Sequence, residues 1–274
     1  MTSRTIEGMD GWVAYLGKVE IPVLKQTARD LIALQEDAEH ISARGVADVI
    51  TRDPMMTVKL LRYLQSHKHK KQEHEVIQVE QALLMLGVEA FFSRLSPEPL
   101  AEDLLRSNTV ALINLLNVVH RAQRASQYAR DWAVYLRDMH FEEVHIAALL
   151  HDLAELLMWC FAPDEMLKIL ELQQQNKAMR SRLAQEQVLG FALVDLQLAL
   201  AHEWSLPKLL FTLMDDACAT QTRVRNVVLA VNLSRHSIQG WNDPALPDDY
   251  REIGELLKLK PEKVMDMVGA QSGK

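Results

Sequence analysis

The sequence is poor in the residues that build disulfide scaffolds, β-sandwiches and membrane spans. It has two cysteines among 274 residues, too few for a disulfide framework or a zinc ribbon. Its ten glycines and nine prolines are few for this length, which argues against a sandwich, a barrel or a disordered chain. We find no apolar run of about 18 residues, so no membrane span is expected. The first residues, Met1–Trp12, lack the apolar stretch of a signal peptide.

Basic residues are fewer than acidic ones, with 30 Lys and Arg against 37 Asp and Glu. The formal net charge is −7, a poor match to nucleic acid, which needs a basic face. Lys68, Lys70 and Lys71 lie among histidines and glutamates, which a solvated loop explains better than a binding patch. Cys160 and Cys218 lie in apolar runs, as reduced core thiols of a cytosolic protein do. We therefore expect a cytoplasmic protein that binds neither nucleic acid nor membrane.

Helix signals dominate what is present. Asp53 and Pro54 precede an apolar helix, where Asp can cap and proline fits the first turn because its missing N–H is not needed. Similar starts recur at Pro207 and Pro261. Between them apolar residues recur at spacings of three and four, as from Leu24 to Ile32, which is the period of an amphipathic helix. Alternating strand patterns between turn residues are absent from the sequence. The predicted fold class is all-α.

The predicted helices fall into two lobes and a tail. Residues 17–96 form the N-terminal lobe, 97–240 the second lobe, and 241–274 a tail with short helices. The boundary lies at Ser96–Pro99, because its two prolines break any helix that runs through it. Helices are expected near 22–36, 42–51, 54–65, 76–86, 88–95, 100–137 (with one break), 141–159, 163–173, 180–188, 190–203, 207–217, 220–238, 249–257 and 261–268.

The N-terminal lobe carries an ordered set of landmarks. Ile21–Leu24 opens a helix, as a Leu-Pro motif does in the HDOD family. Val46–Pro54 and Val58–Arg62 look like that family's helix ending in Asp-Pro and its following Leu-Leu-Arg helix. Gln81–Gly87 looks like its helix that ends in Leu-Gly. No single piece is specific, but their order and spacing resemble the HDOD family.

The second lobe extends the resemblance. Ala147–Leu153 looks like the Leu-Leu-His-Asp element of HD-related domains, and Gly190–Pro207 like the element that ends in Trp-x-Leu-Pro. The match covers roughly residues 18–235. It implies a distorted, divergent HD-type helical bundle in the second lobe and a role in bacterial signal transduction. The implied partners are signalling proteins, and the sequence leaves their identity open. It also leaves open the oligomeric state, and a homo-oligomer is possible.

HD-type hydrolases hold a divalent metal with an early His, a His-Asp pair and a late Asp. By resemblance, the early His maps to His120, the pair to His151 and Asp152, and the late position to Asn232. Imidazole and carboxylate donors suit a first-row dication, which can generate hydroxide from bound water. The Asn232 amide is a neutral and weak ligand, without the charge that a hard dication prefers.

Further departures surround this set. Ala154 and Glu155 follow the His-Asp pair where active relatives have Gly-Lys, so a phosphate-binding cation is replaced by a carboxylate. Leu193 stands where they often carry another His, and Asp215-Asp216 lies where a His pair would end the helix. We interpret the four residues as a vestigial metal site, with His120, His151 and Asp152 in a buried hydrogen-bonded cluster. No cofactor is expected beyond a weakly bound divalent metal.

Three functions remain open. The favoured one is a non-catalytic signalling module that acts through protein or small-ligand binding. The alternative is a metal-dependent phosphohydrolase acting on a nucleotide or cyclic dinucleotide, which His120, His151 and Asp152 would support. A third is a helical protein-interaction platform without a small ligand. Whether the chain is an enzyme is left open, with the degenerate site arguing against it.

Overall fold

The structure is a computed structural model that describes residues 6–37, 41–68, 75–176 and 179–270. In these ranges every regular element is helical, and the only β-pairing is an isolated parallel bridge between Val23 and Leu100. The predicted all-α fold is confirmed. Lys70 and Lys71, which we assigned to a solvated loop, lie outside the described residues.

Two compact units make up the chain, and both are discontinuous in sequence. Unit 1 comprises residues 1–118 and 152–206, and unit 2 comprises residues 119–151 and 207–274. The boundary that we predicted at residues 96 and 97 lies inside unit 1 and does not coincide with the boundary between the units. Compactness does not test which segments fold on their own, so the linear domain division stays a prediction.

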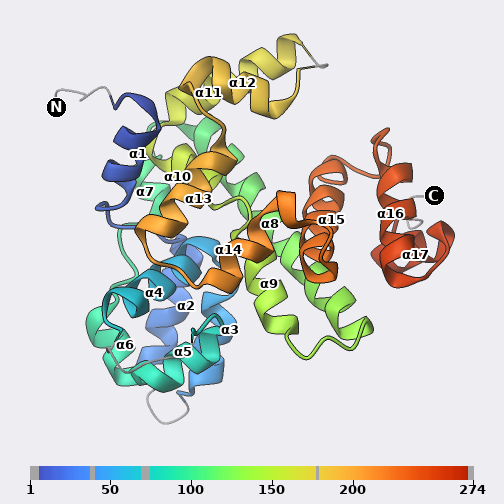
Figure 1. The fold of residues 1–274 in the computed structure, drawn as a ribbon. Helices are drawn as coiled ribbons and strands as arrows, with labels where there is room; N and C mark the ends of the chain where they lie inside the picture. The colour runs from blue at the N-terminus through green and yellow to red at the C-terminus, as the bar shows by residue number, and fades with distance from the viewer. Residues whose placement is uncertain (1–5, 38–40, 69–74, 177–178, 271–274) are drawn as a thin grey trace. The chain divides into compact units, whose positions relative to one another are not determined.

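Unit 1 contains the first part of α8 and eleven further helices in the described ranges (Figure 1). They are α1 Gly8–Leu16, α2 Lys25–Glu36, α3 Ala43–Ile50, α4 Pro54–Ser66, α5 Val79–Leu86, α6 Val88–Arg94, α7 Ala101–Leu104, α10 Leu153–Phe161, α11 Pro163–Gln175, α12 Ser181–Leu189 and α13 Leu193–Glu203. Helix α3 packs on α2 and α5, α10 packs on α4 and α13, and α11 and α12 form a hairpin. Helix α1 was not predicted. Trp12 and Leu16, one turn apart, are its buried residues.

Asp53 shows why α4 begins where the sequence predicts. Its Oδ1 accepts hydrogen bonds from the backbone N–H groups of Met55 and Met56, at 2.9 and 3.1 Å. Its Oδ2 accepts from the N–H of Leu24 at 2.8 Å, which ties the start of α2 to the start of α4. Pro54 occupies the first turn. The capping prediction is confirmed, and the same carboxylate also joins two helices.

The segment Ser96–Pro99 is bonded into unit 1. The N–H of Val23 donates to the carbonyl of Pro99, and the N–H of Ala101 donates to the carbonyl of Val23, both at 2.9 Å. The buried ammonium of Lys59 donates to the carbonyl of Glu98. The two prolines do end helical structure here, but the backbone beside them is fixed by these bonds.

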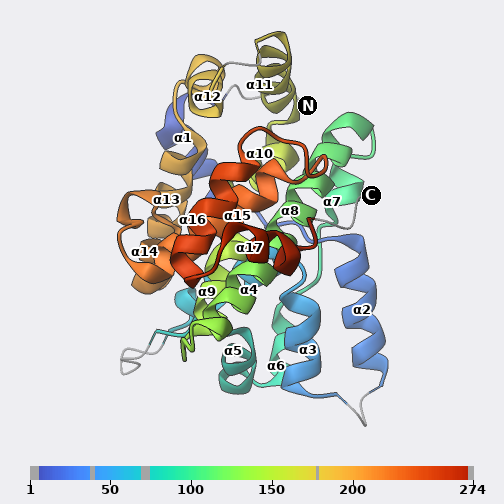
Figure 2. The same cartoon turned by 90° about the vertical axis from the view of Figure 1, so that its right-hand side faces the viewer.

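In the described residues, unit 2 consists of the rest of α8 (Thr109–Tyr135 in full) and six further helical elements. These are α9 Phe141–Leu150, α14 Lys208–Met214, the short 3-10 helix η1 Asp216–Cys218, α15 Thr222–His236, α16 Leu246–Leu257 and α17 Pro261–Val268 (Figure 2). Arg223 of α15 binds the carboxylate of Asp138 at 2.6 and 2.8 Å. Asn226, also on α15, donates to the carbonyl of Ala129 at 3.0 Å, which joins α15 to α8.

One stretch, Phe141–Phe161, is long and apolar enough to cross a membrane by length and composition alone. It comprises α9 and α10, and 83% of its most apolar window is buried inside the protein. Its hydropathy is that of core helices, because its apolar side chains are covered by protein. We predicted one helix over residues 141–159. The structure divides this stretch at His151 and Asp152.

Candidate functional site

His151 and Asp152 form the turn between α9 and α10. Helix α9 ends at Leu150 and α10 begins at Leu153, so the pair interrupts an otherwise apolar stretch. Both residues are buried, at 8% and 7% exposure. Buried polar side chains require hydrogen-bond partners, because unpaired burial is costly. The partner of His151 therefore decides what chemistry this turn supports.

That partner is a carboxylate from a distant part of unit 2. Nε2 of His151 lies 3.0 Å from Oδ1 of Asp216, the first residue of η1. Asp215, just before it, caps η1 by accepting the N–H of Ala217 at 3.0 Å. The His151 side chain is buried, whereas the Asp216 side chain is 54% exposed. A hydrogen-bonded carboxylate fixes the tautomer of an imidazole and favours a proton on the nitrogen that faces it.

Sequence reasoning did not pair His151 with Asp216, although one signal pointed to this position. By the resemblance, Asp215-Asp216 aligns with a His pair that ends the helix in active relatives, and this alignment stays a prediction. In the structure this departure places a carboxylate within hydrogen-bond distance of His151.

The other predicted site residues lie in different surroundings. His120 is exposed on α8, and Asn232 is half-buried on α15. The expectation of one buried cluster of His120, His151 and Asp152 is therefore wrong for His120. In a long helix such as α8, exposure alternates every few residues, and His120 falls on the solvent side next to buried Val119.

The donor set, as the structure places it, does not fit a divalent metal. Among the residues that the structure describes, no three His, Cys, Asp or Glu side chains lie together so that they could hold a metal ion. His151 is bonded to Asp216, His120 is exposed, and Asn232 offers a neutral amide. A hard dication prefers several charged oxygen ligands, which this set lacks. The assignment of His120, His151, Asp152 and Asn232 as remnants of a metal site stays a prediction.

A protein-family model described as the HDOD domain matches residues 21–218. The chain belongs to the HDOD domain family. The match begins at Ile21, where we placed the first landmark, and covers the landmarks quoted for both lobes. No curated protein matches the chain.

Two solved structures share the fold of this HDOD chain. A virulence factor from Campylobacter jejuni subsp. jejuni is 20% identical, with a TM-score of 0.65, over 96% of this chain and 92% of that one. The MmoQ response regulator from Methylococcus capsulatus str. Bath is 17% identical, with a TM-score of 0.67, over 92% of this chain and 99% of that one. At these identities the likeness establishes the fold alone.

The first turn of α10 in the HDOD chain is already engaged by a protein group. The backbone N–H of Ala154 donates to Oε1 of Gln197, on α13, at 3.2 Å, and Gln197 is buried. Anion sites at helix N-termini depend on N–H groups that point at the ligand. This N–H is committed to Gln197, and Glu155 adds negative charge to the same turn. The turn therefore disfavours a phosphate group.

His145 has a structural explanation. Its Nδ1 lies 3.1 Å from the carbonyl of Ser126, which joins α9 to α8 within unit 2. Burial lowers the pKa of His145, an effect that the bond to Ser126 opposes in part. A neutral imidazole that donates to a backbone carbonyl needs no further function.

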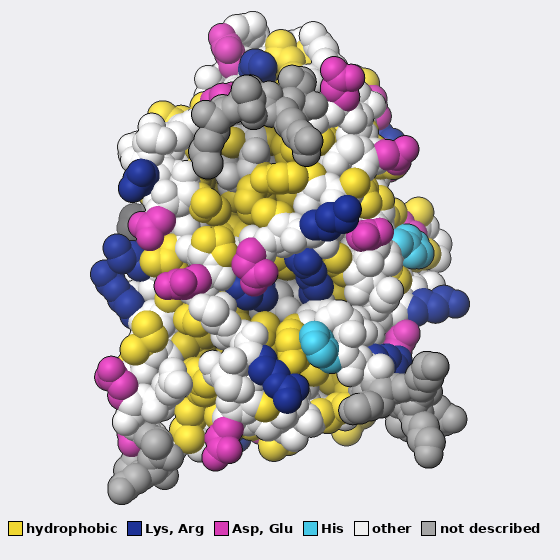
Figure 3. Space-filling view, turned by 90° about the vertical axis from the view of Figure 1, so that its left-hand side faces the viewer, with side chains coloured by type: hydrophobic (Ala, Val, Ile, Leu, Met, Phe, Trp, Pro, Cys, Tyr) yellow, Lys and Arg dark blue, Asp and Glu magenta, His cyan; other side chains and the backbone are white. Residues whose placement is uncertain are grey.

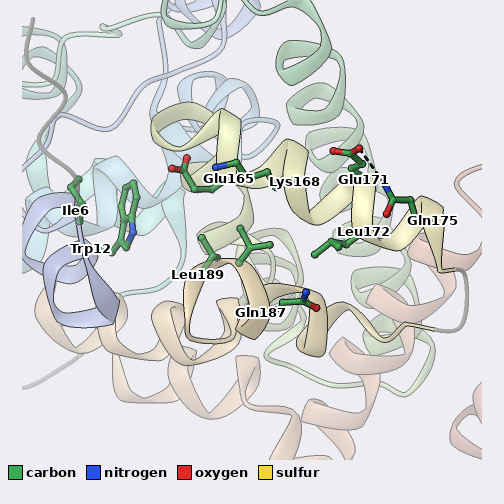
Figure 4. A pocket seen from close by; sticks show the side chains of 10 residues that line it. Ile6, Trp12, Glu165, Lys168, Glu171, Leu172, Gln175, Gln187 and Leu189 are labelled. Carbon is green, nitrogen blue, oxygen red and sulfur yellow. Dashed lines mark hydrogen bonds between the residues drawn. The ribbon is translucent and has the colours of Figure 1, made fainter.

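A cavity of about 550 Å³ opens in unit 1 between α1 and the α11–α12 hairpin (Figure 4). Its apolar wall includes Trp12, Leu172 and Leu189. Lys168 lies at its rim, and Gln175 donates to Glu171 at 3.1 Å beside it. Its volume falls in the range of small-ligand sites, roughly 300–1,000 Å³. Sequence reasoning missed it, because Trp12 belongs to the helix that was not predicted.

Proposed function

We propose that this HDOD chain is a non-catalytic bacterial signal-transduction module that acts by binding a protein or a small ligand. Its partners would be other signalling proteins of the cytoplasm, without nucleic acid or membrane. The observation that carries the proposal is the hydrogen bond between buried His151 and Asp216. It occupies Nε2 of the imidazole of the His-Asp pair with a protein carboxylate.

This bond bears directly on catalysis. A metal-dependent phosphohydrolase needs a metal-bound water and donors that keep the metal in place. An Nε2 that donates its proton to Asp216 cannot at the same time ligate a metal, so only Nδ1 of His151 would be left as a metal ligand. Glu155, in place of a lysine, would repel a phosphate oxygen rather than bind it. These features favour binding over hydrolysis.

Membership of the HDOD family and the shared fold support the signalling part. The MmoQ protein, which has this fold, is a response regulator. The cavity beside Trp12 supplies a site of suitable size for a small ligand. The exposed apolar side chains of unit 1, described in the next subsection, supply a surface suitable for a protein.

Phosphate release tests the proposal. Purified full-length protein is incubated with a panel of nucleotides and cyclic dinucleotides, with and without Mn²⁺. We expect no release above the buffer rate, and weak or substoichiometric Mn²⁺ binding by titration calorimetry. The proposal fails if the wild type releases phosphate and a folded His151→Ala variant does not. That result would establish the metal-dependent phosphohydrolase instead.

A further inference from the structure

A second hollow in unit 1 has a different character from the cavity beside Trp12. It lies between α2 and α6, is closed at one end by residues 97–100, and has a volume of about 290 Å³. We call it the α2–α6 groove. Its apolar lining residues include Ala28, Leu31, Ile32, Phe91, Phe92 and Leu95.

Part of this apolar lining reaches the surface. Ala28, Leu31, Phe91 and Leu95 are buried and form the floor. Ile32 is 50% exposed at the edge, and Phe92 is half-buried. Figure 3 shows apolar side chains at the surface in the lower part of the face that carries α6. An apolar lining open to solvent on a soluble domain marks a contact surface.

The walls of the groove are preformed. The N–H of Lys25, at the start of α2, donates to both carboxylate oxygens of Glu102, at 2.9 and 3.1 Å. Asp53 accepts the N–H of Leu24 in the same turn. Lys59 holds the carbonyl of Glu98 at the closed end. A groove fixed by such bonds loses little conformational freedom when it binds, which favours affinity.

The rim along α2 is basic, although the chain carries a net charge of −7. Lys25 and Arg29 lie one turn apart, line the groove and are exposed. Glu98 is the acidic residue of the lining and lies at the closed end. Charge complementarity therefore favours an acidic group opposite α2.

We propose that the α2–α6 groove binds an amphipathic helical segment of a signalling partner. Apolar side chains at i and i+3 or i+4 of that segment fill the groove, and an acidic side chain beside them faces Lys25 and Arg29. A channel between two helices with an apolar floor is the form that receives such helices. A volume near the lower limit of small-ligand sites also favours a few inserted side chains over a whole ligand. This inference rests on the proposed binding function and specifies its partner's chemistry.

The test uses a display library of amphipathic helical peptides with randomised apolar anchors and with either acidic or basic flanks. Full-length wild type should enrich peptides from the acidic half. Ile32→Asp places a charge at the groove edge and should weaken binding of the enriched peptides by about tenfold or more, because an apolar side chain of the peptide would then cover an unpaired carboxylate. Val110→Asp makes a matched change at a 54% exposed apolar residue on α8, outside the groove, and should bind as wild type does.

A charge reversal tests the acidic requirement separately. The double variant Lys25→Glu, Arg29→Glu should shift enrichment to the basic half of the library. Both side chains are exposed, so the two substitutions change the charge of the rim along α2 from positive to negative. Circular dichroism checks that each variant folds. The proposal is overturned if no peptide is enriched, if Ile32→Asp binds as wild type does, or if charge reversal leaves the preference unchanged. Self-association of the wild type that Ile32→Asp abolishes would instead assign the groove to a second copy.

These outcomes are separable from failure of the proposed function. Phosphate release by the wild type would remove the non-catalytic function and leave the peptide selection unaffected. Conversely, the protein could release no phosphate and enrich only peptides that ignore Ile32→Asp. The binding module would then stand, and the α2–α6 groove would be rejected as its site.

Discussion

Asp53 in unit 1 and His151 in unit 2 are both buried members of HDOD landmarks, but they are held differently. Asp53 accepts three backbone N–H groups, from Leu24, Met55 and Met56. Two of these donors lie within three residues of it in sequence. His151 pairs with the carboxylate of Asp216, 65 residues away and half exposed to water. The Asp53 carboxylate holds backbone N–H groups in place, whereas the hydrogen bond between His151 and Asp216 joins two side chains.

The two landmarks differ in what their hydrogen bonds do for the fold. Backbone donors at a helix start have no other partner in the fold, so their acceptor is part of the architecture. A hydrogen bond between a buried imidazole and a partly exposed carboxylate meets the imidazole's need for a partner but adds little to the stability of the fold. We therefore expect the Asp-Pro landmark to determine stability and the His-Asp landmark to contribute less.

The largest effect should come from Asp53→Ala. The change leaves the N–H groups of Leu24, Met55 and Met56 without their acceptor in a fully buried position. We expect a loss of about 3–5 kcal/mol in the free energy of unfolding. Urea unfolding followed by circular dichroism measures it, and hydrogen exchange should localise the loss to the starts of α2 and α4.

Asp53→Asn is the matched control for charge. Burial raises the pKa of Asp53, while its bonds to Leu24, Met56, Thr27 and Met55 lower it. An amide keeps one acceptor oxygen and no charge, so the loss should be smaller, about 1–2 kcal/mol. Equal losses in the two variants would show that the charge, and not the number of acceptors, stabilises the cap.

His151→Ala should have an intermediate effect. Removing the imidazole leaves a cavity and a polar environment without its partner, at a cost of about 1–3 kcal/mol. The loss should appear in hydrogen exchange of α9 and η1, in unit 2, and not in α2 or α4. A loss as large as that of Asp53→Ala would contradict the distinction drawn between the two landmarks.

Asp216→Ala should cost less, about 0.5 kcal/mol, because water replaces a half-exposed carboxylate readily. The double variant with His151→Ala measures the coupling of the pair in a double-mutant cycle. Additive losses would show that the bond between His151 and Asp216 contributes nothing to stability. They would also show that Asp216 does not hold the imidazole of His151 in place.

Local chemistry explains how much of the fold the sequence predicted. Helix α4 was expected at residues 54–65 and spans Pro54–Ser66, because the Asp-Pro start acts within one turn. Helix α1 was missed because its buried residues are only Trp12 and Leu16, too short a pattern to detect. The break at His151 and Asp152 was missed because the flanking residues read as one apolar helix.

The site was less predictable because its partners are remote. Nothing near His151 in sequence indicates Asp216, and the exposed position of His120 depends on how α8 packs. The α2–α6 groove joins residues about sixty positions apart in sequence, together with Pro97 and Glu98 of the segment that we read as a linker. The prolines at 97 and 99 do signal a helix end. They do not reveal that the same backbone is fixed by Val23 and Lys59.

The smallest expected effect concerns His145, a half-buried polar group of unit 2 that, like Asp53, is bonded to backbone. Burial lowers its pKa from 6.5, although the carbonyl of Ser126 and nearby Asp131 favour the charged form. The unfolded chain therefore takes up a proton near pH 6.5, whereas the folded chain does so only at lower pH. Between these values the unfolded state binds more protons, so stability is full above pH 6.5 and falls as the pH drops through this window. Because His145 is only half-buried, the change should stay below about 0.5 kcal/mol. His145→Gln keeps a donor for Ser126 but cannot titrate, so its unfolding free energy should vary less between pH 7 and pH 5 than that of the wild type. Parallel curves for the two proteins would show that His145 does not contribute to the pH dependence.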